Sequence, residues 1–156
     1  MTAGVVPSTA AAEPHDRVRH ETVLRVVLVA LAFSALFVGA WALLAPTGFY
    51  DDFPGAGHHW VSADGPFNEH LIRDVGGLQL ALVVMTVAVA IRPERFFVRA
   101  VALATLVFAV PHFIYHATHL HPFETADKVA VVSSLGLGVV LAFVAIGLTF
   151  GAPQRT

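Results

Sequence analysis

Four long apolar runs, separated by short polar stretches, dominate the pattern of hydrophobic and polar positions along the 156-residue chain. Each run reaches or exceeds the roughly 20 residues that an α-helix needs to cross the hydrocarbon core of a bilayer. Because short segments join consecutive runs, we expect antiparallel neighbours in an all-α, integral membrane four-helix bundle. The predicted transmembrane helices cover about residues 23–45, 66–91, 97–120 and 128–150.

The segments between the runs carry signals for helix ends and turns. Pro46 follows the first run as a stop, and residues 47–65 contain Gly, Pro and Asp but neither Lys nor Arg, which predicts a loop. Pro66 suits the first turn of the second helix, with Asp64 or Gly65 as its cap. Pro111 lies inside the third run, where a proline removes one helical hydrogen bond and favours a kink.

Composition excludes several classes of protein. Hydrophobic residues make up 56% of the chain and charged residues 13%, which is typical of a membrane protein that contacts the lipid bilayer. The formal net charge is −2 and no basic face is visible, so nothing points to nucleic acid. Without cysteine there is no disulfide, thiolate metal site or CxxC chemistry, and any metal must be held by nitrogen and oxygen atoms.

The positions of the arginines predict the orientation. By the positive-inside rule both termini lie in the cytoplasm, in an N-in/C-in multi-pass protein of the cytoplasmic (inner) membrane. Residues 1–22 read as a disordered cytoplasmic tail, residues 23–150 as the four-transmembrane-helix domain and residues 151–156 as a second cytoplasmic tail. The arginines that define the cytoplasmic side are Arg17, Arg19, Arg25, Arg92, Arg95, Arg99 and Arg155.

Two polar stretches interrupt the apolar pattern at the predicted extracytoplasmic side. P-H-F-I-Y-H-A-T-H-L-H, at residues 111–121, places three of its four histidines within a helical arc of roughly 60°. N-E-H-L-I-R-D, at residues 68–74, opens the second helix with a polar face of its own. Ionisable groups inside a membrane face the bundle interior or water. We therefore expect the two stretches to meet in a polar pocket.

These stretches supply a candidate metal site. His112 and His116 stand at i and i+4, as paired histidines do in helical zinc sites, and His70 with Asp74 can complete the site from the second helix. The donor set suits a divalent transition metal, namely zinc, iron or copper. His119 is an alternative ligand. Haem held between two histidines is a further alternative, although nothing in the sequence favours it specifically.

A metal at this position predicts a membrane oxidoreductase or hydrolase, with Glu69 as proton acceptor and Arg73 as an anion-stabilising group. The same residues permit a non-enzymatic subunit or scaffold, in which a polar network fixes helix packing. A proton-coupled carrier is the third alternative. Small-residue helix faces also favour a homo-oligomer or a membrane partner subunit; these are Gly77 with Ala81, and Ala130, Ser134, Gly138 and Ala142.

Three motifs carry a resemblance to a known family. W-A-L-L-A-P at the end of the first helix, N-E-H-L-I-R-D-V-G-G in the second and P-H-F-I-Y-H-A-T-H-L in the third resemble small bacterial integral membrane proteins of the DoxX-like kind, over residues 23–150. The resemblance implies a compact four-helix bundle and a link to quinone-dependent oxidoreductase systems. The spacing H-x-x-x-H-x-x-H also resembles one box of the membrane desaturases, which need several such boxes facing the cytoplasm.

Overall fold

The computed structural model describes residue 18 and residues 20–150, so the predicted terminal tails, with Arg17, Arg19 and Arg155, lie largely outside the described residues. Within that part the chain is all-α. Four of its helices are long and apolar enough to cross a membrane, which identifies a multi-pass membrane protein. The elements are α1 (Glu21–Leu44), α2 (Pro46–Asp52), α3 (Glu69–Ile91), α4 (Arg95–Thr118) and α5 (Thr125–Gly147).

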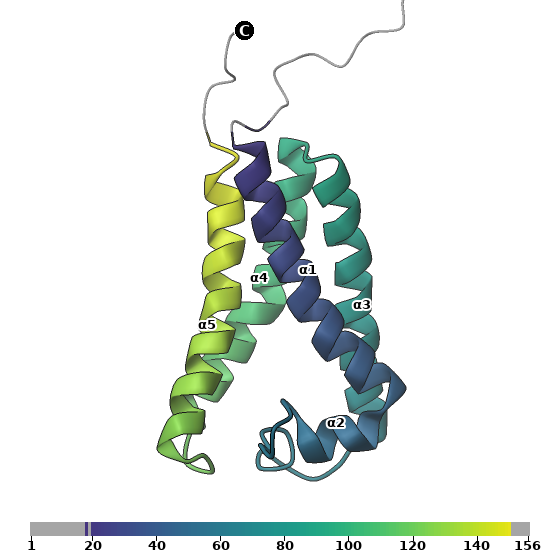
Figure 1. Cartoon of the computed structure of the whole chain (residues 1–156), viewed down its shortest axis with the longest axis vertical. Helices are drawn as coiled ribbons and strands as arrows, with labels where there is room; N and C mark the ends of the chain where they lie inside the picture. Colours follow the sequence, from purple (N-terminus) through teal and green to yellow (C-terminus); the bar gives the residue numbers. More distant parts are fainter. Residues whose placement is uncertain (1–17, 19, 151–156) are drawn as a thin grey trace, which may run out of the picture.

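The four long helices form two pairs, α1 with α3 and α4 with α5, and packing is most extensive within each pair. Figure 1 shows the pairs close together where α1 begins and α5 ends, and diverging toward the opposite end. A hydrophobic cluster joins all four helices at the first of these ends, which we call the core end. Its most deeply buried members are Leu24, Leu28, Val98, Ala102 and Ala145.

The opposite end, which carries α2, is built differently, and we call it the α2 end. Its hydrophobic cluster centres on Ala42, Phe49 and Ile72, from α1, α2 and α3. Partly buried side chains of α1, α2 and residues 53–68 pack around these three, and α4 and α5 contribute none of the described members. At the α2 end the second helix pair is therefore outside this apolar cluster.

Helix α2 corrects the prediction of a loop after Pro46. Proline has no backbone N–H to donate, and the first helical position needs none, so Pro46 begins a helix here instead of only ending one. Phe49 of α2 packs its ring edge-on against Trp41 of α1, with centroids 6.1 Å apart. Burial of Phe49 thus holds the short helix against the first pair.

Helix α3 begins at Glu69 and not at about residue 66, because the Asn68 side chain accepts a hydrogen bond from the backbone N–H of Leu71 at 3.1 Å. Its close approach to α1 is made at Gly76. A Cβ added to Gly76 would lie 2.6 Å from the backbone nitrogen of Leu43, whereas one added to Gly77 would meet no atom within 4 Å. The predicted pair of Gly77 with Ala81 is therefore not the α1 contact.

Candidate functional site

The polar opening of α3 makes contacts within its own helix pair. His70 Nε2 lies 3.4 Å from Asp74 Oδ2, one turn away, and both side chains are well exposed. The Nε of Arg73 donates to Glu69 at 2.8 Å, and its Nη1 donates to the carbonyl oxygen of Leu43 at 2.5 Å. That carbonyl lies in the last turn of α1, where helical partners run out, so Arg73 caps α1.

The histidines of α4 form a row on the other helix pair. The rings of His112 and His116 meet edge to face with centroids 4.7 Å apart, and Phe108 stacks on His112 at 5.0 Å. Helix α4 contains Pro111 and ends at Thr118, so His119 lies just beyond it. The ring of His119 stacks on Tyr115 at 4.2 Å, and its Nδ1 lies 2.8 Å from the Tyr115 carbonyl oxygen. Tyr115 thus contacts both His119 and His116.

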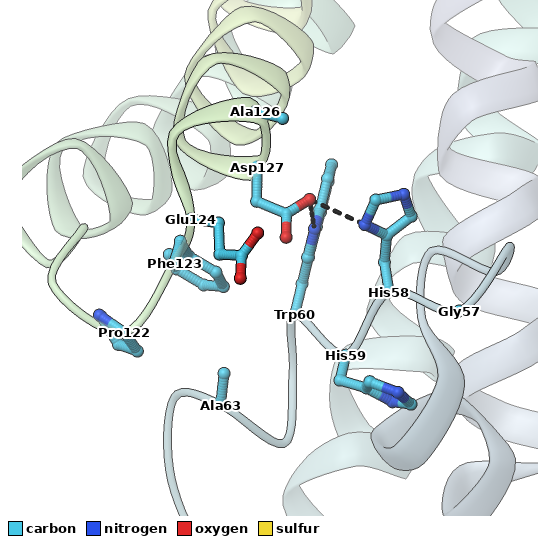
Figure 2. A pocket seen from close by; sticks show the side chains of 10 residues that line it. All are labelled: Gly57, His58, His59, Trp60, Ala63, Pro122, Phe123, Glu124, Ala126 and Asp127. Carbon is cyan, nitrogen blue, oxygen red and sulfur yellow. Dashed lines mark hydrogen bonds and ion pairs between the residues drawn. The ribbon is translucent and has the colours of Figure 1, made fainter.

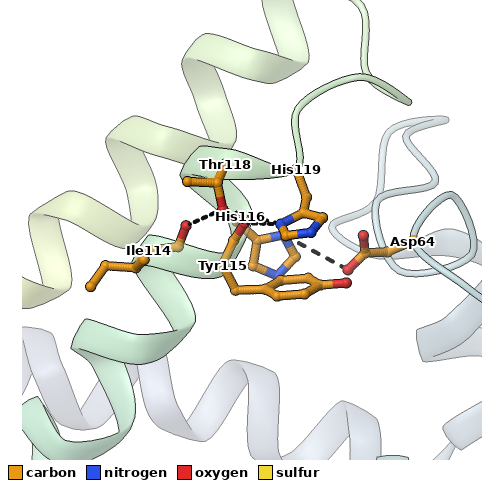
Figure 3. A network of polar contacts seen from close by, with 6 residues as sticks. All are labelled: Asp64, Ile114, Tyr115, His116, Thr118 and His119. Carbon is orange, nitrogen blue, oxygen red and sulfur yellow. Dashed lines mark hydrogen bonds and ion pairs between the residues drawn. The ribbon is translucent and has the colours of Figure 1, made fainter.

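Asp64 faces this row from the segment between α2 and α3. Its Oδ2 lies 4.0 Å from Nδ1 of His116, and the two side chains are only 22% and 17% exposed (Figure 3). That nitrogen is buried and has no hydrogen-bond partner among the residues the structure describes. A separation of 4.0 Å exceeds hydrogen-bond length but is within the reach of an ion pair. The contact connects the second helix pair to the segment that leaves α2.

A second group of contacts joins the same segment to the start of α5. The Nδ1 of His58 lies 2.8 Å from Asp127, and the indole N–H of Trp60 donates to the same carboxylate at 3.0 Å. These three residues border a cavity of about 430 Å³ between residues 57–63 and 122–127. In Figure 2 the carboxylates of Glu124 and Asp127 point toward the indole of Trp60, which is seen edge-on.

The predicted four-ligand metal site is not assembled here. Among the residues the structure describes, no group of three or more His, Asp or Glu side chains is arranged to hold a metal ion. No hydrogen bond or ion pair joins His70 or Asp74 to the α4 histidines in that part of the chain, and the expectation that these two stretches meet stays a prediction. Residues 68–74 begin α3 and residues 111–121 end α4, so the two stretches belong to different helix pairs, which diverge at the α2 end. The catalytic roles of Glu69 and Arg73 stay predictions.

Sequence reasoning overlooked the residues that do reach across. It offered Asp64 only as a helix cap and placed Trp60 and His58 in a loop without a role, yet each contacts the second helix pair. The available signal was that residues 47–65 and 121–128 both concentrate carboxylates and histidines at one end of the predicted bundle.

No protein-family model matches the chain, and no curated protein or solved structure matches it either. The DoxX-like likeness is accordingly limited to the quoted motifs, and the function has to be argued from the site itself.

Proposed function

We propose that this multi-pass membrane protein is a proton-coupled carrier, with its proton bound between His116 and Asp64. One observation carries the proposal: the buried, unpartnered Nδ1 of His116 faces a carboxylate across 4.0 Å. A buried polar atom without a partner costs about 1–3 kcal/mol, so its retention calls for an explanation such as a functional role or a bound water or ion. A proton on this nitrogen converts the gap into an attractive ion pair.

The position of Asp64 couples that proton to the arrangement of the helices. Residue 65 beside it is held by α2, which packs against the first helix pair, because the Tyr50 hydroxyl donates to the carbonyl oxygen of Gly65 at 2.8 Å. His116 belongs to α4 of the second pair. Proton binding therefore draws the two pairs together at the α2 end, and proton release lets them separate. Conformational change gated by protonation is what a coupled carrier requires.

The orientation inferred from the arginines supports the direction of access. It puts the α2 end outside the cytoplasm, so His116 exchanges protons with the outer face. His112 continues the row one turn deeper into the span, next to Phe108. A second histidine at that depth gives the proton its next position on the way inward.

A packing scaffold is the second candidate, and the bridge from His58 and Trp60 to Asp127 favours it. Under that hypothesis the polar contacts fix the distance between the helix pairs whatever the protonation of His116. The carrier predicts that the distance between the helix pairs changes with pH, whereas the scaffold predicts that it stays constant. A single distance measurement separates the two functions.

The experiment measures the separation of the two pairs by pulsed electron paramagnetic resonance. The chain has no cysteine, so nitroxides attach only at introduced positions, here Gly65→Cys and His121→Cys. Both sites are exposed. We expect the distance to shorten on acidification in the parent, and to become insensitive to pH with His116→Gln. The matched control is His70→Gln, which removes a histidine whose carboxylate partner is on its own helix.

Transport is tested with the same variants in liposomes under an imposed pH gradient. A panel of small amines, carboxylates and divalent metal ions is followed across the membrane. Movement driven by the gradient and lost with His116→Gln or Asp64→Asn supports the carrier. A distance that is constant with pH, together with no solute moved, overturns the proposal in favour of the scaffold.

A further inference from the structure

The cavity at the α2 end has walls suited to one class of ligand. Its volume, about 430 Å³, falls within the range of about 300–1,000 Å³ that is typical of small-molecule sites. Two aromatic side chains line it, Trp60 and the buried Phe123, together with two carboxylates, Glu124 and Asp127. Neither Lys nor Arg is among its described lining residues. The cavity therefore attracts positive charge.

The two carboxylates are engaged differently. Asp127 accepts the indole N–H of Trp60 at 3.0 Å and lies 2.8 Å from His58, so its negative charge is already shared. Glu124 makes neither a hydrogen bond nor an ion pair with any described side chain, and as the residue before α5 it does not cap that helix. Figure 2 shows its carboxylate directed into the cavity. One negative charge thus remains available for a ligand.

We infer that the cavity binds a small organic ammonium ion, whose charge lies between Glu124 and the indole face of Trp60. Aromatic faces attract ammonium groups through their quadrupole, and a nearby carboxylate adds a Coulomb attraction. A metal ion fits less well, because the described side chains offer no converging set of three ligands. The inference rests on the proposed carrier function, since it names the class of solute that the carrier moves.

The cavity and the proton site share a segment of chain. Trp60 and Asp64 both belong to residues 53–68, with Trp60 on the cavity wall and Asp64 facing His116. A hydrogen bond from the backbone N–H of Ala63 to the carbonyl oxygen of His59, at 3.1 Å, ties this stretch into a compact turn. Displacement of the segment by a ligand at Trp60 is therefore transmitted to Asp64, which links occupancy of the cavity to proton binding.

The first test is a binding measurement by isothermal titration calorimetry on the full chain in detergent, without any gradient. Choline is the probe, and 3,3-dimethyl-1-butanol is its neutral counterpart of the same shape. We expect choline to bind about 5-fold or more tightly than the neutral alcohol, because only choline carries the charge that Glu124 and Trp60 recognise.

Variants identify the residues responsible. Glu124→Gln removes an exposed charge and Trp60→Leu removes the aromatic face; each is expected to weaken choline binding about 5-fold or more. Asp52→Asn is the matched control, since it removes an exposed carboxylate outside the cavity and is expected to leave the affinity unchanged. Circular dichroism verifies that each variant keeps its helix content.

Three outcomes overturn the inference: equal binding of choline and the neutral alcohol, an equal loss with Asp52→Asn, or binding of Zn²⁺ with no binding of choline. These outcomes are distinct from failure of the carrier. If the carrier alone is wrong, choline binds but the pH gradient moves nothing. If the ligand class alone is wrong, choline does not bind, while the pH-dependent distance and the movement of another solute persist.

Discussion

Replacing Asp64 by Asn leaves His116 facing a neutral amide across the same 4.0 Å gap. The attraction that disappears can be calculated from this separation. Two unit charges 4 Å apart interact by about 1 kcal/mol in water and by about 4 kcal/mol at the effective dielectric constant of about 20 typical of protein surfaces. Because both side chains are about one-fifth exposed, we expect a coupling between these limits. That range corresponds to a factor of about 5 to several hundred in the equilibrium constant of unfolding.

A double-mutant cycle measures this coupling directly. The free energy of reversible unfolding in mixed micelles is compared for the parent, Asp64→Asn, His116→Gln and the double variant, in mildly acidic and in alkaline buffer. An imidazolium attracts the carboxylate and a neutral imidazole does not. The coupling is therefore expected at about 1–4 kcal/mol in acidic buffer and near zero in alkaline buffer.

The control cycle uses His70 and Asp74, another pair of a histidine and a carboxylate. These side chains are 88% and 58% exposed and belong to one helix, so their coupling is expected to stay below about 0.5 kcal/mol in either buffer. Equal coupling of His116 with Asp64 in both buffers, or a control coupling of the same size, would refute the reasoning.

Three further predictions concern the first helix pair; the first two are measured by thermal unfolding in detergent and the third by amide hydrogen exchange. Gly76→Ala places a methyl group 2.6 Å from a backbone nitrogen of α1 and should lower the free energy of unfolding by about 1–3 kcal/mol. Gly77→Ala meets no neighbouring atom and should leave the stability unchanged or raise it. Similar stability of the two variants would contradict the packing of α1 against Gly76. Asn68→Ala removes the cap of α3 and should cost about 1 kcal/mol, an effect that Asn68→Ser should largely restore. Arg73→Gln leaves the Leu43 carbonyl without its donor, and faster amide exchange near the end of α1 is expected; unchanged exchange would exclude the capping role.

The spans were predictable because they depend on a local property. A helix that crosses a membrane must keep its apolar side chains over about 20 consecutive residues, and such a run is visible without knowing its neighbours. Helix α2 was missed for an equally local reason, because a proline after an apolar run also suits the first position of a new helix. Gly76 and Gly77 are adjacent in the sequence, and which of them contacts α1 depends on which face of α3 packs against that helix.

The site was predictable only in part. The spacing of His112 and His116 placed their rings together, and the structure confirms that contact. Their partner Asp64 was missed because sequence spacing describes a single helix, whereas the meeting of a loop with a distant helix depends on the lateral order of the helices. The short linker between the second and third spans suggested that these two pair as antiparallel neighbours, yet α3 packs far more extensively against α1 than against α4.

Because the hydrophobic cluster holds the helices together at the core end, a small rotation of a helix pair there produces a larger displacement at its other end. A helix of 24 residues, such as α4, is about 36 Å long at a rise of about 1.5 Å per residue. Rotation by about 5° around the cluster, small enough for side chains there to keep their neighbours, therefore displaces the far end by about 3 Å. A displacement of that size would widen the 4.0 Å separation of His116 and Asp64 to a gap that admits water. Modest repacking near Leu28 and Val98 thus becomes a large change in spacing at the opposite membrane surface.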